Sequence, residues 1–222
     1  MAVASDENRR PIKSRQWPVF HSAAAWLARV GVSPDVISLT SIVFGILAGL
    51  AFASTARVES ETLRRVLWVF GALCVQMRLV ANLLDGLVAV EGGRASAVGE
   101  LYNEAPDRVA DATILLGLGY ADGGDPMLGA LASVVAVFTA YVRALGANTG
   151  VGQVFLGPMV KPQRMAVVTA AAMLCALTPR SWQIDVAAQL DVVDLSLLAI
   201  IAGGLFTAAR RLRRIAQLLR QR

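Results

Sequence analysis

The sequence predicts an all-α integral membrane protein with six transmembrane helices and an N-terminal interfacial helix. Of its 222 residues, 56% are hydrophobic and only 17% are charged, and the mean hydropathy is +0.58. A soluble domain of this size carries about 25% charged residues. Several apolar runs reach the roughly 20 residues that a helix needs to cross a bilayer. Because six such spans use most of the chain, we expect residues 1–222 to form a single domain.

The expected spans follow from the apolar runs and from the helix-start signals beside them. Ser33, Pro34 and Asp35 are suited to the N-cap, the first position and the first turn of a helix. Residues 17–31 place aromatic and apolar side chains at helical spacing, which is typical of a helix that lies at the membrane surface. The six spans are expected at residues 34–56, 66–90, 104–121, 127–147, 163–179 and 186–207.

Small residues and cysteines within the spans indicate packing rather than chemistry. Gly45 and Gly49 are four residues apart in the first span, and such a face lets another helix approach closely. Cys74 and Cys175 each lie in an apolar run, with no second Cys or His nearby. We therefore expect two free buried thiols, and neither a disulfide framework nor a thiolate metal site.

The distribution of Lys and Arg predicts the orientation of the chain. With both termini inside, most of the 21 Lys and Arg residues lie in inner segments. This bias makes residues 1–33 a cytoplasmic or interfacial segment and residues 208–222 a basic cytoplasmic tail. Basic ends that flank a hydrophobic bundle indicate contact with anionic lipid rather than with nucleic acid. We expect a multi-pass protein of a bacterial inner membrane, with its active site facing the cytoplasm.

Carboxylates and amides are concentrated where the second and third spans meet at the cytoplasmic side. Even lenient insertion scales give a cost of ~2.5–3.5 kcal/mol for an ionised residue at mid-bilayer, so such residues face a polar cavity or bind something. Asn82 and Asp85 share one helical face, and Asn103, Asp107 and Asp111 follow at four-residue spacing. Two helix ends joined by a glycine-containing loop can therefore direct oxygen atoms toward one point.

The oxygen-only side chains of this stretch are suited to a hard cation such as Mg²⁺ or Mn²⁺. Magnesium that is bound by carboxylates usually also holds substrate phosphates. Gly86, Gly92, Gly93 and Gly99 would let a phosphate approach the backbone. The combination indicates phosphoryl transfer at a membrane surface. The simpler alternative is a set of helix-end acids that are solvated among lipid headgroups.

The same stretch resembles the signature of the CDP-alcohol phosphotransferase family. That signature has two Asp three residues apart, the second followed by Gly, then Ala-Arg, an eight-residue gap, Gly, and two further Asp at four-residue spacing. The segments "GVSPDVISLTS" before the first span and "AYVRALG" at residues 140–146 also look like the family, as do the six spans. In this chain the frame is kept in length as Asn82, Asp85-Gly86, Ala89-Val90, eight residues, Gly99, Asn103 and Asp107.

The resemblance implies a reaction and a set of roles. In that family four Asp hold two metal ions, and the last Asp is the general base that activates a hydroxyl. The hydroxyl attacks the lipid-side phosphorus of a CDP-linked substrate and expels CMP. By position, Asp107 would be the catalytic base, and Gly86, Ala89 and Gly99 would lie against the cytidine nucleotide. The implied partners are CDP-diacylglycerol or a related CDP-alcohol, a small alcohol acceptor, membrane lipid and a second copy of the chain in a homodimer.

Three positions depart from the signature. Asn82 and Asn103 replace the first and third Asp, and Val90 replaces the Arg. An amide oxygen can ligate a metal but brings no charge, so half of the formal negative charge of the signature is lost. Asp111, one turn beyond the signature, and Glu104 are the residues that could restore it. We therefore expect one or two Mg²⁺ or Mn²⁺ ions, with Asn82, Asp85, Asn103, Asp107 and Asp111 as ligands and the three Asp as the essential acids.

Basic residues near the same face suggest a phosphate-binding pocket. Arg143 lies near the inner end of the fourth span, and Lys161 and Arg164 precede or begin the fifth. Together they could bind a phosphate-bearing acceptor or the diphosphate. The alternative is that they are positive-inside residues without a ligand. Arg78, inside the second span, either pairs with an acid or phosphate or extends to the interface.

The sequence therefore predicts a membrane transferase of phospholipid biosynthesis, which moves a phosphatidyl or related phospho-alcohol group from a CDP-linked lipid to an alcohol. One alternative is a catalytically altered family member that binds nucleotide or lipid without turnover, which the two Asn and Val90 motivate. The other alternative is a membrane transporter, because acids in membrane helices are common in transporters. The acids of this chain cluster at one surface and no inverted repeat is visible, which favours the enzyme.

Overall fold

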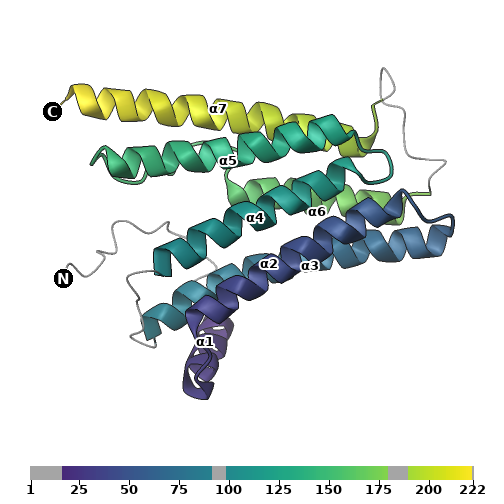
Figure 1. Cartoon of the computed structure of the whole chain (residues 1–222), viewed down its shortest axis with the longest axis horizontal. Helices are drawn as coiled ribbons and strands as arrows, with labels where there is room; N and C mark the ends of the chain where they lie inside the picture. The colour runs from purple at the N-terminus through teal and green to yellow at the C-terminus, as the bar shows by residue number, and fades with distance from the viewer. Residues whose placement is uncertain (1–16, 92–98, 180–189, 222) are drawn as a thin grey trace.

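The described residues of the chain form an elongated bundle of seven α-helices (Figure 1). This computed structural model describes residues 17–91, 99–179 and 190–221, and the side chains of residues 90–103 are outside the description. The helices are α1 (Pro18–Val30), α2 (Pro34–Thr55), α3 (Glu61–Glu91), α4 (Gly99–Gly119), α5 (Pro126–Asn148), α6 (Lys161–Leu177) and α7 (Val192–Arg220).

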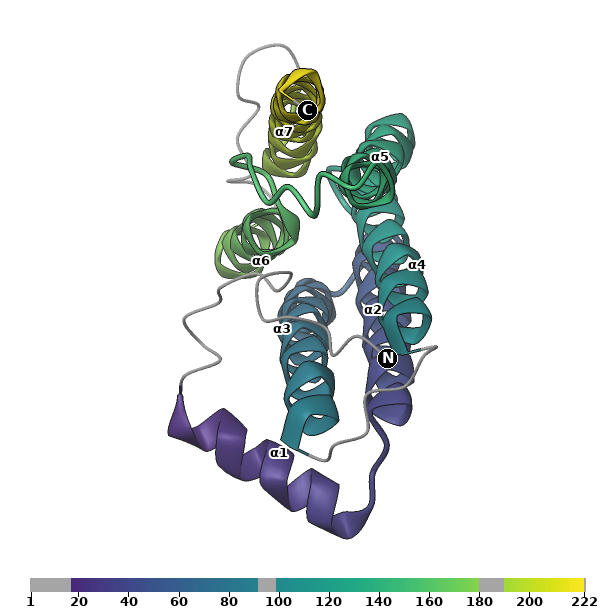
Figure 2. The same cartoon turned by 90° about the vertical axis from the view of Figure 1, so that its left-hand side faces the viewer.

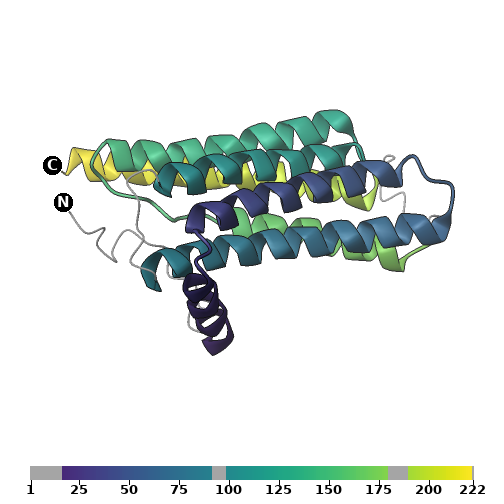
Figure 3. The same ribbon diagram turned by 60° about the horizontal axis from the view of Figure 1, so that its bottom comes forward.

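Helices α2 to α7 run lengthwise beside one another, whereas α1 lies across one end (Figure 2 and Figure 3). Ala24 of α1 is buried in a small cluster with Ala81 and Val88 of α3. Trp17 at the N-cap of α1 and Trp26 within the helix are exposed. An apolar surface rich in Trp beside the bundle is suited to the headgroup region of a bilayer.

Four helices in the described part of the chain are long and apolar enough to cross a membrane. The remaining two of the six expected spans do not meet that criterion. Helix α4 carries several acids and Arg108 in its first half, and α6 has only 17 residues. The protein is thus a multi-pass membrane protein by helix length and composition. The four spans are Pro34–Thr55, Glu61–Ala89, Pro126–Asn148 and Val192–Arg220.

Helix α7 differs most from its expected span. It begins at Val192, while residues 186–189 of the expected span lie outside the description, and it continues to Arg220 without a break. Residues 208–220 are therefore the last turns of this helix, while residue 222 is outside the description. Arg and Leu are good helix formers, and Ala208, Arg211 and Ile215 keep the buried face at helical spacing.

Helix α2 starts as the sequence predicts and meets α4 at very short range. The Ser33 hydroxyl accepts a hydrogen bond from Val36 N at 3.3 Å, with Pro34 in the first turn. A Cβ atom added to Gly49 would lie 2.4 Å from the carbonyl oxygen of Thr113, and one added to Gly117 would lie 2.2 Å from Gly49 O. The expected close approach of another helix at the glycine face is confirmed, because only glycine leaves room for the two backbones.

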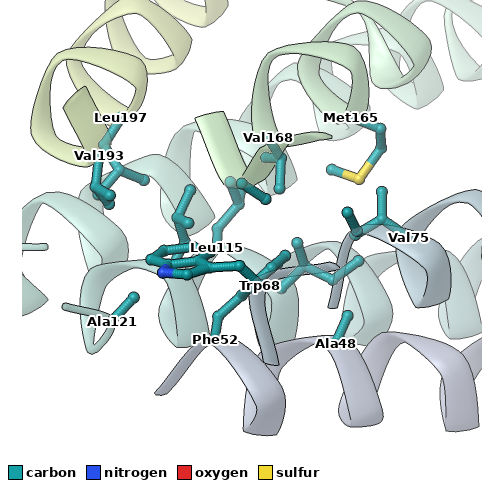
Figure 4. Close-up of a cluster of buried hydrophobic side chains, with 14 of the residues drawn as sticks. Ala48, Phe52, Trp68, Val75, Leu115, Ala121, Met165, Val168, Val193 and Leu197 are labelled. Atoms are coloured by element: carbon teal, nitrogen blue, oxygen red, sulfur yellow. The ribbon is translucent and has the colours of Figure 1, made fainter. Parts of the chain in front are cut away.

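The largest hydrophobic core lies in the half of the bundle away from α1 (Figure 4). The rings of Phe52 and Trp68 are 5.4 Å apart, and both side chains are fully buried. Cys74 and Cys175 are free thiols buried in this cluster, as expected. The packing fixes the relative positions of α2, α3, α4 and α6, which continue toward the other half and carry the polar residues there.

Candidate active site

The polar residues of the motif converge in the half of the bundle where α3 ends and α4 and α6 begin (Figure 1). Helix α3 contributes Arg78, Asn82 and Asp85, which lie three or four residues apart and so share one face. Helix α4 contributes Asp107 and Asp111 by the same spacing. The two helices therefore present polar faces to each other, and α6 closes the site with its first turn.

Asp107 is the most heavily contacted acid of the site. Its two carboxylate oxygens lie 2.5 and 2.6 Å from Lys161 Nζ at the start of α6. Arg78 Nη2 donates to Oδ1 at 3.1 Å, and the Asn82 amide nitrogen donates to the same oxygen. The side chain is only 6% exposed. The acid that the family resemblance designates as the base thus joins α3, α4 and α6.

Asp111 lies one turn further along α4 and is 1% exposed. Arg78 Nη1 forms an ion pair with Oδ1 at 2.7 Å, and Arg164 Nη2 donates to Oδ2 at 2.5 Å. Arg78 therefore bridges Asp107 and Asp111 and is completely buried. Of the two possibilities for Arg78, the structure has it paired with acids and not extended to the interface.

Asp85 is buried on the α2 side of the site. Its Oδ2 atom accepts a hydrogen bond of 2.7 Å from the Ser38 hydroxyl. It is also close enough to Asp107 and Lys161 for direct electrostatic interaction. Gly86 and Ala89, predicted to lie against a nucleotide, are partly exposed on α3. Gly99 begins α4, while the side chains of Val90 and Asn103 are outside the description.

Glu104 does not add its charge to the carboxylates of Asp107 and Asp111. One of its oxygens accepts from Arg108 Nη2 at 2.6 Å, and the other pairs with Arg143 on α5. A carboxylate shared by two guanidinium groups is already compensated. The suggestion that Glu104 restores the charge lost at Asn103 is therefore not supported by its contacts.

Arg143, Lys161 and Arg164 line one small cavity beside Asp107, of about 60 Å³. The sequence grouped these three residues, and the structure brings all of them together. Arg164 reaches the cavity while it holds Asp111, and Lys161 reaches it while it holds Asp107. The cavity therefore combines positive side chains with the predicted catalytic carboxylate.

Arg211 of α7 completes the cavity wall and was not anticipated from the sequence, which grouped it with the basic tail. It is 5% exposed, and it donates to Leu156 O at 2.9 Å and to Thr139 O at 2.8 Å. Arg211 lies on the buried face of α7, between Ala208 and Ile215. The neighbouring arginines of the helix are exposed, namely Arg210, Arg213 and Arg214. That helical spacing was the signal that could have identified it.

The donor set fits one hard cation better than two. Among the described side chains, no three His, Cys, Asp or Glu residues gather in a metal-binding arrangement. Asp85 and Asp107 carboxylates and the Asn82 amide oxygen are chemically suited to one divalent ion. A second ion would need further anionic ligands, but Asp111 is held between Arg78 and Arg164. The side chains that the structure describes therefore do not fit the two-ion site that four Asp would make.

The chain is similar in sequence to enzymes named phosphatidylinositol phosphate synthase. It is 30% identical over 155 residues to the one from Streptomyces avermitilis, covering 67% of this chain and 59% of that protein. It is 26% identical over 167 residues to the one from Mycolicibacterium smegmatis, covering 72% and 70%. It is 23% identical over 184 residues to the archaetidylinositol phosphate synthase of Methanothermobacter thermautotrophicus, covering 83% of each. No family model matches the chain.

Solved structures of Mycobacterium tuberculosis phosphatidylinositol phosphate synthase share the fold. The structure with CDP-DAG bound aligns with a TM-score of 0.69 at 18% identity, covering 90% of this chain and 94% of that one. The structure in complex with manganese and citrate aligns with a TM-score of 0.68 at 18% identity, covering 88% of each. The helices of this chain thus follow the path of a known membrane enzyme fold.

Proposed function

We propose that this homologue of the CDP-alcohol phosphotransferases is a transferase of phospholipid biosynthesis. It moves a phosphatidyl or related phospho-alcohol group from a CDP-linked lipid to an alcohol acceptor and releases CMP. The observation that carries the proposal is the cavity in which Asp107 meets Arg143, Lys161 and Arg164. The cavity offers a base and several phosphate-binding groups within one site, as the reaction requires.

The reaction is an exchange of one phosphoester bond for another. The acceptor hydroxyl oxygen bonds to the lipid-side phosphorus, while the bond from that phosphorus to the bridging diphosphate oxygen breaks. The hydroxyl proton passes to a carboxylate oxygen of Asp107, and CMP leaves with the electron pair. Lys161 and Arg78 keep Asp107 ionised and oriented, and fixed positive groups stabilise the charge that develops on phosphate oxygens.

A divalent cation, Mg²⁺ or Mn²⁺, is part of the proposal. The manganese complex of the related structure supports a metal in this fold. In this chain Asp85, Asp107 and the amide oxygens of Asn82 and Asn103 would hold it, and it would neutralise charge on the diphosphate. Gly86, Ala89 and Gly99 would lie against the nucleotide, because they occupy the signature positions next to these ligands.

The acceptor is proposed to be a phosphorylated polyol. Arg143 and Arg164 carry guanidinium groups that bind phosphate through two parallel hydrogen bonds, and Arg211 adds a third to the same cavity. Three sequence relatives are named as inositol phosphate lipid synthases, so an inositol phosphate is the first acceptor to test.

The membrane arrangement proposed for residues 1–222 is one domain with six spans, α2 to α7, and with α1 at the interface. Asp107 and Asp111 of α4 and Arg164 of α6 are buried in the bundle, where such residues can be accommodated within a membrane. The Lys and Arg distribution favours a cytoplasmic active site in a bacterial inner membrane. The family resemblance favours a homodimer.

The function is tested by CMP release from CDP-diacylglycerol by the purified chain with Mg²⁺ or Mn²⁺. Inositol phosphate is compared with inositol, glycerol phosphate and serine as acceptors. The variant Asp107→Ala should lose release, whereas Asp125→Ala, an Asp on an exposed helix start in the other half of the bundle, should keep it. Full activity of Asp107→Ala would exclude Asp107 as the base.

A non-catalytic nucleotide or lipid binder is a second candidate, and one observation favours it. Both oxygens of Asp107 contact Lys161, so a substrate hydroxyl has to compete with an ammonium group. The two candidates differ in one measurement. Binding of CDP-diacylglycerol without CMP release, across the acceptor panel, would establish the binder and exclude the transferase.

A further inference from the structure

The three described Asp residues of the site are matched in number by three basic side chains, of which Arg78 and Arg164 are buried and Lys161 is partly exposed. Asp85, Asp107 and Asp111 carry three negative charges, and Arg78, Lys161 and Arg164 carry three positive charges. In the four-Asp signature, by contrast, the negative charge has to be balanced by metal ions. The formal charge of this cluster is therefore zero before any metal binds.

The basic residues are fixed within the cluster. Arg78 contacts both Asp107 and Asp111, Lys161 contacts both oxygens of Asp107, and Arg164 holds the far oxygen of Asp111. Arg78 and Arg164 are 0% and 2% exposed. Charges in such an environment interact much more strongly than charges at a protein surface, and they are tolerated only when they are paired.

The Asn82 side chain turns its amide nitrogen, not its amide oxygen, toward Asp107. Its nitrogen donates a hydrogen bond to Asp107 Oδ1, so the N–H bond points at the carboxylate. To share an ion with Asp107, Asn82 would have to turn its amide so that the oxygen faces the ion. The Asn82–Asp107 contact thus joins the two residues directly, at a position where two carboxylates would repel each other unless a cation lay between them.

We infer that Arg78, Lys161 and Arg164 are an internal cation cluster, which supplies the positive charge that a second divalent ion would otherwise supply. The chain accordingly binds one divalent ion at most. This inference deepens the proposed function, since it concerns the charge balance of the same site. It is nevertheless measurable without turnover, because ion binding does not require substrates.

The first test counts ions on the full-length chain in lipid nanodiscs without substrates. Free Mn²⁺ is followed by electron paramagnetic resonance during titration, which gives the number of ions bound per chain. We expect no more than one. Two ions bound per chain with comparable affinity would overturn the inference, whether or not the protein releases CMP.

The second test changes the charge balance by one unit in two independent ways. Asn82→Asp adds a carboxylate next to Asp107, and Lys161→Met removes the ammonium group from it. Each should increase the affinity for Mn²⁺ by about tenfold or more, or raise the number of bound ions. The matched controls are Asn148→Asp and Arg213→Met, at exposed positions outside the cluster, and they should leave Mn²⁺ binding unchanged.

If either Asn82→Asp or Lys161→Met fails to fold, the other variant still tests the inference. An unchanged Mn²⁺ affinity in a folded Asn82→Asp protein would overturn it. Failure of the proposed function has a different outcome, because a chain that binds one ion but never releases CMP would contradict the transferase and support the cation cluster.

Discussion

Lys161 Nζ lies within 2.6 Å of both carboxylate oxygens of Asp107, so the first turn of α6 is bound to the middle of α4. The contact connects the predicted base with a residue that was expected to bind substrate phosphate. Lys161 also lines the cavity, where it is in position to exchange Asp107 for an incoming phosphate. In the proposed reaction, this ammonium group would link the binding of a phosphate-bearing substrate to the release of the base.

Replacement of Asp107 with Asn should lower kcat by about 10²- to 10⁴-fold, which is the usual contribution of a general base. The amide keeps the size of the side chain but cannot accept the hydroxyl proton. CMP release at saturating CDP-diacylglycerol measures the loss. A decrease of less than threefold would show that another group removes the proton.

Replacement of Arg78 with Met should lower the free energy of unfolding by about 3–5 kcal/mol, because it removes one buried cationic partner from each of two carboxylates. Both Asp107 and Asp111 lose an ion pair in this variant. The thermal unfolding midpoint in detergent is the readout. Arg210→Met, at an exposed position of α7, removes a charge without breaking a buried pair and should unfold near the wild-type temperature.

Replacement of Arg143 with Gln should raise the KM for a phosphorylated acceptor by about tenfold, with a smaller change in kcat. A charge-assisted hydrogen bond to phosphate contributes roughly 1.5–3 kcal/mol. The KM for CDP-diacylglycerol should change much less. If instead only that KM rises, Arg143 binds the diphosphate of the donor. Arg213→Gln is the matched control on an exposed surface.

Replacement of Gly49 with Leu should prevent α2 and α4 from packing, because even a Cβ atom at this position would lie 2.4 Å from Thr113 O. We expect aggregation or a strongly lowered unfolding temperature, measured by size-exclusion chromatography and thermal unfolding. Ala209→Leu, which adds the same kind of bulk at an exposed position, should remain monodisperse. A normally folded Gly49→Leu protein would contradict the close helix contact.

Local signals in the sequence were sufficient to predict the helices, but not to predict which side chains of different helices contact each other. The Ser33 cap, the start of α2 at Pro34 and the glycine face at Gly45 and Gly49 depend on residues a few positions apart, and the structure agrees with each. Helix α7 continues past residue 207, the predicted end of the last span, because the residues of the basic segment favour a helix.

Contacts between helices were harder to predict, because periodicity tells which residues share a face but not which helix that face meets. Arg78 could have paired or extended to the interface, and only the approach of α4 decides between the two. Glu104 was suggested as a residue that could add negative charge near the metal ligands, but its carboxylate forms ion pairs with Arg108 and Arg143. The metal, nucleotide and catalytic roles of individual residues remain predictions that the variants above test.

The buried pair of Arg78 and Asp107 also constrains how the protein enters the membrane. Helix α3 would carry an arginine through the bilayer interior at a cost of several kcal/mol if it were inserted alone, and α4 would carry unpaired aspartates. Arg78 of α3 pairs with both aspartates of α4, and Lys161 and Arg164 of α6 supply the remaining positive charge. Insertion machinery that releases α3, α4 and α6 into lipid together would avoid these penalties, so the three helices form a natural unit of membrane integration.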